Sequence, residues 1–173
     1  MKIEIGTYCL RDWRKDDLAD IAGYANNPKI AANLRDGFPS PYTLEDAKQF
    51  LDRVFAQNPR TFFAIAAPGE AIGGIGLMLG RDVHRCTAEL GYWLAEPFWG
   101  KGIMTSAVAA FTEYGFQEYA LNRIHAEPYC SNFASMRVLE KAGFVFEGRM
   151  RASVLKNNEI LDQCIYARIR QGI

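Results

Sequence analysis

The chain has 173 residues, enough for one well-buried core and too few for two comfortable domains, so we expect a single domain over residues 1–173. About half of the residues are hydrophobic, which is ordinary for a globular protein. Its 20 basic and 20 acidic residues leave no formal net charge, which argues against a dedicated nucleic-acid-binding protein, since such proteins usually carry a basic excess.

Four cysteines, at positions 9, 86, 130 and 164, form no C-x-x-C pair. Only His84 and His125 accompany them, so no zinc-like spacing exists and we expect no metal. We interpret the cysteines as reduced. No stretch approaches the roughly 18 apolar residues of a membrane span, and no signal pattern is present, so we expect a cytoplasmic protein without a membrane partner.

The first half of the chain mixes helical and extended patterns. Strands are expected at residues 8–11 (with an extension back to residue 3), 61–66 and 71–79, and helices at residues 15–26, 28–34 and 43–57. The third helix begins with a capping-box-like sequence at Thr43 and Asp46. Glycine and prolines make residues 36–42 a loop.

The second half continues this mixture. Strands are expected at residues 87–94, 122–127, 145–155 and 159–169, and helices at residues 101–119 and 132–142. Asn132 suits the N-cap of the last helix, and Gly143 its C-terminal end. The order predicts an α/β (α+β) fold, with a mixed, mostly antiparallel sheet flanked by helices.

A glycine turn separates the strand at 87–94 from the next helix. Gly100 and Gly102 would let the backbone approach a ligand without an intervening Cβ. The first amides of the helix have no internal partners, and the helix dipole adds positive character there, so the segment suits a diphosphate. The pattern is neither G-x-G-x-x-G nor a P-loop, and a simple tight turn is the competing interpretation.

Two stretches together resemble the GNAT superfamily of acetyl-CoA-dependent N-acetyltransferases, in particular its ribosomal-protein (Rim-type) branch. The first is the glycine turn Trp99-Gly100-Lys101-Gly102-Ile103-Met104, preceded by Gly91-Tyr92-Trp93-Leu94. The second runs from Asn132 through Ser135 and Val138-Leu139-Glu140-Lys141 to Gly143-Phe144. The order of elements is similar over nearly the whole chain, so the resemblance implies a single-domain GNAT-like acyl-CoA N-acyltransferase fold.

The resemblance also implies a binding site for acetyl-CoA. The amides of residues 99–105 would receive the pyrophosphate, the strand end would pair with the pantetheine arm, Asn132 would reach the pantetheine, and Ser135 would lie near the sulfur. The implied cofactor-binding residues are Trp93, Leu94, Trp99, Gly100, Lys101, Gly102, Ile103, Met104, Thr105, Asn132 and Ser135. The sequence departs from the superfamily at Trp99 (usually Gln or Arg), at Met104 (usually small) and at Leu139 (often a tyrosine that protonates the thiolate).

Acetyl transfer needs a neutral amine, a donor for the oxyanion and a proton for the thiolate. Glu89 is the first candidate base, because it lies in an otherwise apolar strand, and Glu127 is the second. His125 could relay a proton, and each of these residues has a purely structural alternative. Ser135 is the candidate thiolate acid. Some Rim-type enzymes carry a carboxylate where this chain has Val154, so the base stays open, and a water chain is another candidate.

Aromatic residues near the turn (Tyr92, Trp93, Phe98 and Trp99) are interpreted as core. Phe38 and Tyr42 lie in the proline-rich loop and are the better candidates for an acceptor pocket, because loops carry specificity.

The main hypothesis is an N-acetyltransferase for the α-amine of a protein. An α-amine has a pKa of about 7.7–8 and needs little help to lose its proton, whereas a lysine near 10.4 needs more. The alternatives are a small-amine (polyamine or aminoglycoside-like) acetyltransferase and a CoA-binding module without turnover. Monomer and homodimer both stay open.

Overall fold

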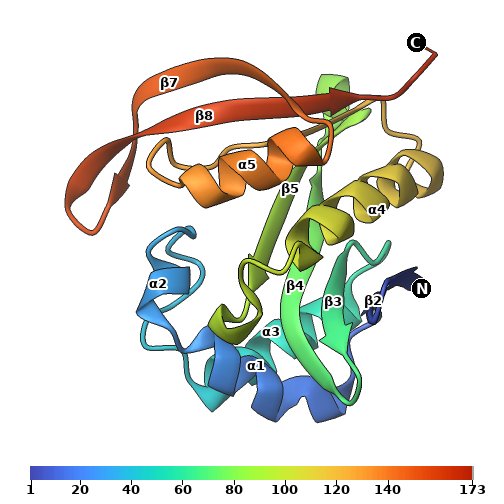
Figure 1. Cartoon of the computed structure of the whole chain (residues 1–173), viewed down its shortest axis with the longest axis vertical. Helices are drawn as coiled ribbons and strands as arrows, with labels where there is room; N and C mark the ends of the chain where they lie inside the picture. The colour runs from blue at the N-terminus through green and yellow to red at the C-terminus, as the bar shows by residue number, and fades with distance from the viewer. Residues whose placement is uncertain (173) are drawn as a thin grey trace. The chain divides into compact units, whose positions relative to one another are not determined.

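The computed structural model describes residues 1–172 (Figure 1). The strands are β1 (Lys2–Ile5), β2 (Tyr8–Arg11), β3 (Phe62–Ala67), β4 (Glu70–Leu79), β5 (Thr87–Leu94), β6 (Arg123–Ala126), β7 (Val145–Lys156) and β8 (Glu159–Ile169). The helices are α1 (Leu18–Ala25), α2 (Pro28–Ala31), α3 (Leu44–Ala56), α4 (Ile103–Glu118) and α5 (Phe133–Lys141), with short 3₁₀ turns η1 (Lys15–Asp17), η2 (Asp82–His84) and η3 (Glu96–Phe98). Contacts divide the chain into a first unit, Met1–Gly76 with Tyr92–Ile103, and a second unit, Leu77–Gly91 with Met104–Ile173.

In the first unit, β1, β2, β3 and β4 are joined in this order by antiparallel pairing. The strand expected at residues 8–11 is β2, whereas the extension expected back to residue 3 is a separate strand, β1, because Gly6, at φ +71°, reverses the chain between them. The end of β5 joins β4 through a hydrogen bond from the Ala95 N–H to the Ile72 carbonyl (2.8 Å).

Helix α3 begins and packs as its sequence predicts. The Thr43 hydroxyl accepts a hydrogen bond from the Asp46 N–H (3.2 Å), and the Asp46 carboxylate accepts one from the Thr43 N–H (2.8 Å). Its apolar face enters the core of the first unit, which comprises Trp13, Ile21, Ala25, Tyr42, Ala47, Leu51, Val54, Ala64 and Ala71. Helix α2 is shorter than expected and ends at Ala31. From there to Leu34 the chain forms only isolated hydrogen-bonded turns.

Two glycines of β4 allow a close approach to Trp93. A Cβ on Gly73 would lie 2.4 Å from the Trp93 carbonyl oxygen, and one on Gly74 would lie 2.8 Å from the indole nitrogen of Trp93. Contacts this short are not compatible with a side chain, so the glycines set the position of Trp93 in the first unit.

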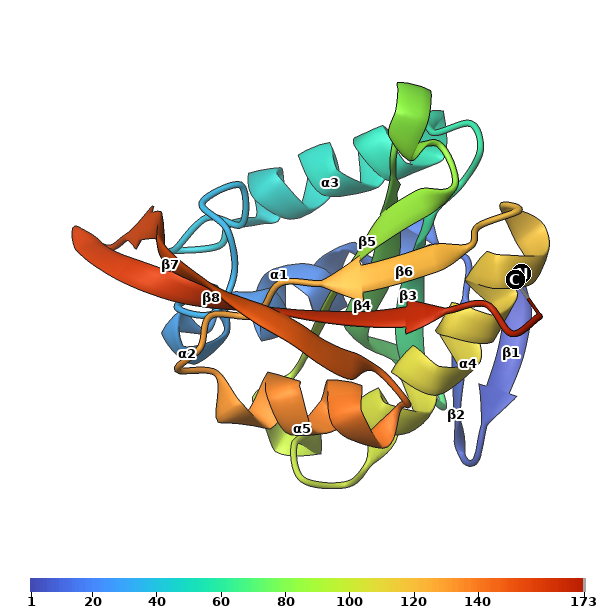
Figure 2. The same cartoon turned by 90° about the horizontal axis from the view of Figure 1, so that it is seen from above.

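In the second unit, β5 and β6 are parallel, and β6, β8 and β7 follow in antiparallel order. Strands β7 and β8 form the long hairpin seen in Figures 1 and 2, with Asn157 and Asn158 at positive φ in its turn. Helix α4 buries Val108 and Phe111 completely, and Ile124 of β6 is buried as well.

The hydrogen-bonded order of the strands is β1-β2-β3-β4-β5-β6-β8-β7. A mixed, mostly antiparallel sheet with flanking helices is therefore confirmed. None of the helices formed by residues 1–172 is both long and apolar enough to cross a bilayer.

Candidate functional site

The glycine turn has the backbone conformation that the sequence predicts. Strand β5 ends at Leu94, and α4 begins at Ile103, directly after the turn. Gly100 and Gly102 lie at φ +74° and +77°, where an L side chain is strained. A Cβ on either glycine would meet no heavy atom within 4 Å, so the backbone is accessible where a ligand would approach it.

Trp99 corrects the expectation that the aromatic residues of this segment are core. Its side chain is 43% exposed, and its indole Nε1–H donates a hydrogen bond of 2.7 Å to the Leu94 carbonyl. Phe98 is half-buried, and the Lys101 ammonium lies 5.3 Å from the centre of its ring. Lys101 therefore adds positive charge beside the two glycines.

A second set of contacts holds the start of this turn. Glu96 of η3 pairs with Lys29 and accepts a hydrogen bond from the Asn27 side-chain amide (2.7 Å). The hydrogen bond from Lys29, and then that from Asn27, hold the pKa of the Glu96 carboxyl below its ordinary value. The turn is thus tied to α2 within the first unit.

Helix α4 starts with two apolar side chains that point into the core. Ile103 and Met104 are both buried, while Thr105 is half-buried. The large residue at Met104 is therefore accommodated, and only its backbone is left to contribute to an anion site.

The parallel ladder between β5 and β6 is short. It pairs Thr87, Ala88 and Glu89 with residues 123–125, and the last pair is Glu89 with His125. Strand β5 runs five residues farther, to Leu94, while β6 ends at Ala126. Glu89 is half-buried rather than enclosed.

The structure brings both candidate bases close to one histidine in the second unit. Paired residues of neighbouring strands share a face, so Glu89 and His125 lie on the same face of the sheet. His125 Nε2 lies 3.6 Å from a carboxylate oxygen of Glu127, and both side chains are 22% exposed. His125 Nδ1 is buried and has no hydrogen-bond partner among the described residues. Glu89, His125 and Glu127 thus form one cluster of titratable groups.

The predicted start of α5 is confirmed. The Asn132 side-chain oxygen accepts a hydrogen bond from the Ser135 N–H (3.1 Å), and Ser135 is half-buried one turn into the helix. Because the side-chain oxygen of Asn132 caps the helix, its side-chain NH₂ group is the part that could donate a hydrogen bond to a cofactor.

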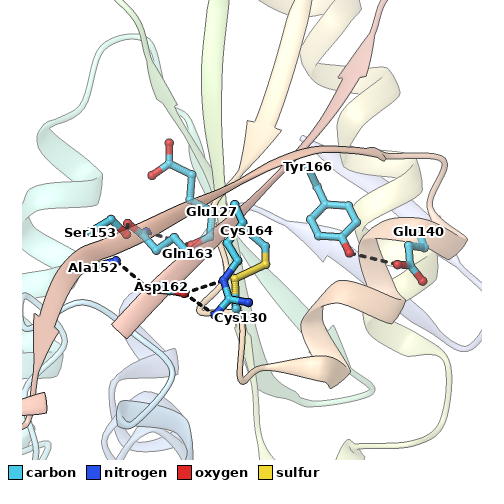
Figure 3. Close-up of a disulfide and its surroundings, with 10 residues drawn as sticks. Glu127, Cys130, Glu140, Ala152, Ser153, Asp162, Gln163, Cys164 and Tyr166 are labelled. Carbon is cyan, nitrogen blue, oxygen red and sulfur yellow. Dashed lines mark hydrogen bonds and ion pairs between the residues drawn. A yellow bond between two sulfur atoms is a disulfide. The ribbon is translucent and has the colours of Figure 1, made fainter. Parts of the chain in front are cut away.

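A disulfide between Cys130 and Cys164 contradicts the interpretation of all four cysteines as reduced (Figure 3). The two residues are 34 positions apart, and their Cα atoms lie 5.3 Å apart. Strand pairing explains their proximity: the Cys130 N–H donates to the Asp162 carbonyl, and the Cys164 N–H donates to the Pro128 carbonyl (both 2.9 Å). No local pattern could have predicted this pair. Cys9 and Cys86 are free.

The same pairing fixes the backbone of Glu127. The buried Gln163 side chain donates to the Glu127 carbonyl (3.1 Å), and the Ser153 hydroxyl donates to Gln163 (3.1 Å) (Figure 3). Nearby, Ala152 forms a bulge at φ +49°, and its N–H donates to Asp162 (2.7 Å). Sequence reasoning missed this network because its members lie on separate strands.

The expected acceptor pocket at Phe38 and Tyr42 is only partly in agreement with the structure. Tyr42 belongs to the core, at 6% exposure, and burial raises the pKa of its hydroxyl to about 12. Phe38 is half-buried, and its ring centre lies 4.8 Å from that of Tyr42 and 5.9 Å from that of Trp93. Tyr42 therefore packs in the core of the first unit, with Phe38 of the loop against it. Among residues 1–172, no three His, Cys, Asp or Glu side chains gather in a way that would hold a metal ion.

The fold defines an acyl-CoA N-acyltransferase class: a mixed sheet that contains the short parallel pair of β5 and β6, with a glycine turn between β5 and the start of α4. A family model described as "Acetyltransferase (GNAT) domain" matches residues 8–145. The chain belongs to this family and is an N-acetyltransferase of the GNAT type, a family whose acetyl donor is acetyl-CoA.

Two similar proteins and one solved structure agree with this family assignment. The chain is 27% identical over 171 residues to "Uncharacterized N-acetyltransferase YnaD" of Bacillus subtilis, covering 99% of this chain and 98% of that protein. It is 33% identical over 107 residues to the ribosomal-protein-serine acetyltransferase of Escherichia coli, covering 62% and 59%. The solved structure of ribosomal-protein-S5-alanine acetyltransferase from Vibrio fischeri superposes with a TM-score of 0.85 at 25% identity, covering 99% and 98%.

Proposed function

We propose that this chain forms one acetyltransferase domain over residues 1–173 and transfers the acetyl group of acetyl-CoA to the α-amine of a protein N-terminus. The observation that carries the proposal is the glycine turn, in which Gly100 and Gly102 adopt positive φ with open space where a Cβ would be. A diphosphate accepts hydrogen bonds from such amides and is attracted by the helix dipole and by Lys101.

The residues that the family resemblance implies would each serve a different part of the acetyl donor. The amides of Gly100, Lys101, Gly102, Ile103, Met104 and Thr105 would bind the diphosphate, whereas the expected contribution of the Trp99 amide is corrected, because its N–H already donates to the Glu96 carbonyl (3.1 Å). The backbone at Trp93 and Leu94 would pair with the pantetheine arm, and the Asn132 amide nitrogen would donate to it. The early end of the β5–β6 ladder supports this assignment, because β5 continues beyond its parallel partner.

The chemical step is a direct attack of the amine nitrogen on the thioester carbon. The amine loses one proton, the carbon–sulfur bond breaks, and the CoA thiolate takes up one proton. Glu127 or Glu89 would accept the amine proton, and their proximity to His125 supports that role. Ser135 would donate a proton to the thiolate.

The choice of an α-amine as acceptor rests on two supports. The Escherichia coli relative is named for acetylation of a ribosomal protein. An α-amine, with a pKa of about 7.7–8, is substantially neutral at physiological pH and so requires only a modest base.

Acetylation of a panel of amines tests the proposal. The panel comprises a peptide with a free N-terminal serine or alanine and no lysine, an N-terminally blocked peptide with one lysine, and a polyamine. Acetyl transfer is read by mass spectrometry, because the free thiols of Cys9 and Cys86 would react with a thiol reagent.

We expect acetylation of the free N-terminus at the highest kcat/KM and little on the blocked peptide. Preferred acetylation of the polyamine would instead support a small-amine enzyme. Binding of acetyl-CoA without transfer to any acceptor would support a binding module.

A further inference from the structure

The geometry points to Trp99 as a positioning residue for the acetyl donor: its indole N–H holds the Leu94 carbonyl and so fixes the glycine turn against the end of β5. This inference rests on the proposed function for its cofactor, while the contact itself belongs to the free protein. Trp99 stands where the superfamily usually has Gln or Arg, so the chain supplies a side-chain N–H here from a different residue type.

The contact spans the segment that leads from the strand to the helix. Trp99 Nε1 lies 2.7 Å from the Leu94 oxygen, a normal hydrogen-bond distance. Between the two residues lies η3, in which the Phe98 N–H donates to the Ala95 carbonyl (3.0 Å) and the Trp99 N–H to the Glu96 carbonyl (3.1 Å). Two glycines at positive φ follow almost at once, and glycines restrain the backbone little. The indole contact therefore restrains the backbone directly before the two conformationally free glycines.

The direction of the Leu94 carbonyl follows from the alternation of the strand. The Ala95 N–H bonds to Ile72 of β4, and the Trp93 carbonyl also lies beside β4, next to Gly73. Backbone groups of successive strand residues point to opposite edges, so the Leu94 carbonyl points away from β4. That edge is the one on which a pantetheine arm would pair with β5.

Two consequences follow for the donor. The Leu94 carbonyl already accepts a hydrogen bond from Trp99, so the pantetheine arm would pair with the end of β5 through the Leu94 N–H, which faces the same edge. Loss of the indole N–H would release the Leu94 carbonyl and loosen the turn, which would weaken donor binding and leave the chemical groups in place.

Four proteins test this inference: the unmodified chain, Trp99→Phe, Trp99→Gln and the control Trp13→Phe. Trp99→Phe keeps an aromatic ring and removes the N–H, while Trp99→Gln restores an N–H donor. Trp13 is a matched control, because its indole N–H is buried without a partner among the described residues. Calorimetry gives the Kd for acetyl-CoA, and steady-state kinetics separates KM from kcat.

We expect Trp99→Phe to raise the Kd and KM for acetyl-CoA about five- to tenfold, the effect of one net hydrogen bond, with kcat and the KM for the acceptor within about twofold. Trp99→Gln should recover most of the affinity, and Trp13→Phe should bind as the unmodified protein does. The NMR signal of the Trp99 indole N–H, identified by its loss in Trp99→Phe, should exchange slowly with water in the free protein.

Unchanged affinity in Trp99→Phe, an equal loss in Trp13→Phe, a failure of Trp99→Gln to recover affinity, or fast exchange of the indole N–H would overturn the inference. No binding of acetyl-CoA by the unmodified protein would overturn the proposed function instead, and with it the cofactor role of Trp99. In that case the Trp99 indole N–H would still exchange slowly with water, because its hydrogen bond to Leu94 belongs to the free protein.

Discussion

Substitution of Gly102 separates the conformational role of the turn from its contact with the donor. At φ +77°, any L residue costs about 1–2 kcal/mol in backbone strain. A Cβ at this position meets no neighbour within 4 Å, so no steric term adds to that cost. For a chain of this size the strain corresponds to a fall in Tm of about 2–8 °C.

Binding should respond much more strongly than stability. Two like unit charges about 4 Å apart repel by about 4 kcal/mol at an effective dielectric constant of about 20, which is roughly a thousandfold in Kd. We therefore expect Gly102→Glu to remove detectable binding of acetyl-CoA. Gly102→Gln has nearly the same size without the charge, so it should bind more weakly than the unmodified protein but more tightly than Gly102→Glu.

Gly6→Ala is the matched control for strain. Gly6 lies at φ +71° in the turn between β1 and β2 and also has open space around its Cβ position. Thermal unfolding should show comparable falls in Tm for Gly6→Ala and Gly102→Ala, and calorimetry should show normal affinity only for Gly6→Ala. Tight binding of acetyl-CoA by Gly102→Glu, or equal affinities of the Glu and Gln variants, would refute a diphosphate at this turn.

Three further predictions concern the second unit. Ser135→Ala should lower kcat about tenfold or more while the Kd for acetyl-CoA changes less than twofold, and an unchanged kcat would remove Ser135 from the chemical step. Reduction of the Cys130–Cys164 disulfide, which closes a loop of 34 residues, should lower the free energy of unfolding by about 3–4 kcal/mol in urea titrations, and identical curves with and without reductant would contradict this. The N–H of Ala152, followed by Arg149, holds the pKa of Asp162 below its ordinary value, so the ionised form stabilises the fold above about pH 4. That contribution should disappear as the pH falls through the lowered pKa, so the difference in unfolding free energy between the unmodified protein and Asp162→Asn should shrink below about pH 4.

Local sequence determined most of the secondary structure. The capping residues Thr43 and Asp46 start α3, Asn132 starts α5, and Asn157 with Asn158 turns the last hairpin, because each signal acts over only a few residues. The mixed sheet followed from the order of these elements. The conformation of Gly100 and Gly102 was also predictable, since only glycine tolerates positive φ without strain.

The site was predictable to a smaller extent. Alternation along one strand was enough to place His125 on the same face as Glu127, but only the register of β5 against β6 brings Glu89 to the same histidine. Their roles, and those of the implied cofactor-binding residues, remain predictions.

Tertiary structure alone decided the contacts between distant segments. Strand pairing joins Cys130 to Cys164, and core packing buries Tyr42, which the loop sequence had suggested as part of a pocket. The exposure of Trp99 and its bond to Leu94 likewise depend on how the chain turns after β5. A residue's own neighbours in sequence fix its backbone preference, whereas its burial and its partners depend on segments that only the folded chain brings together.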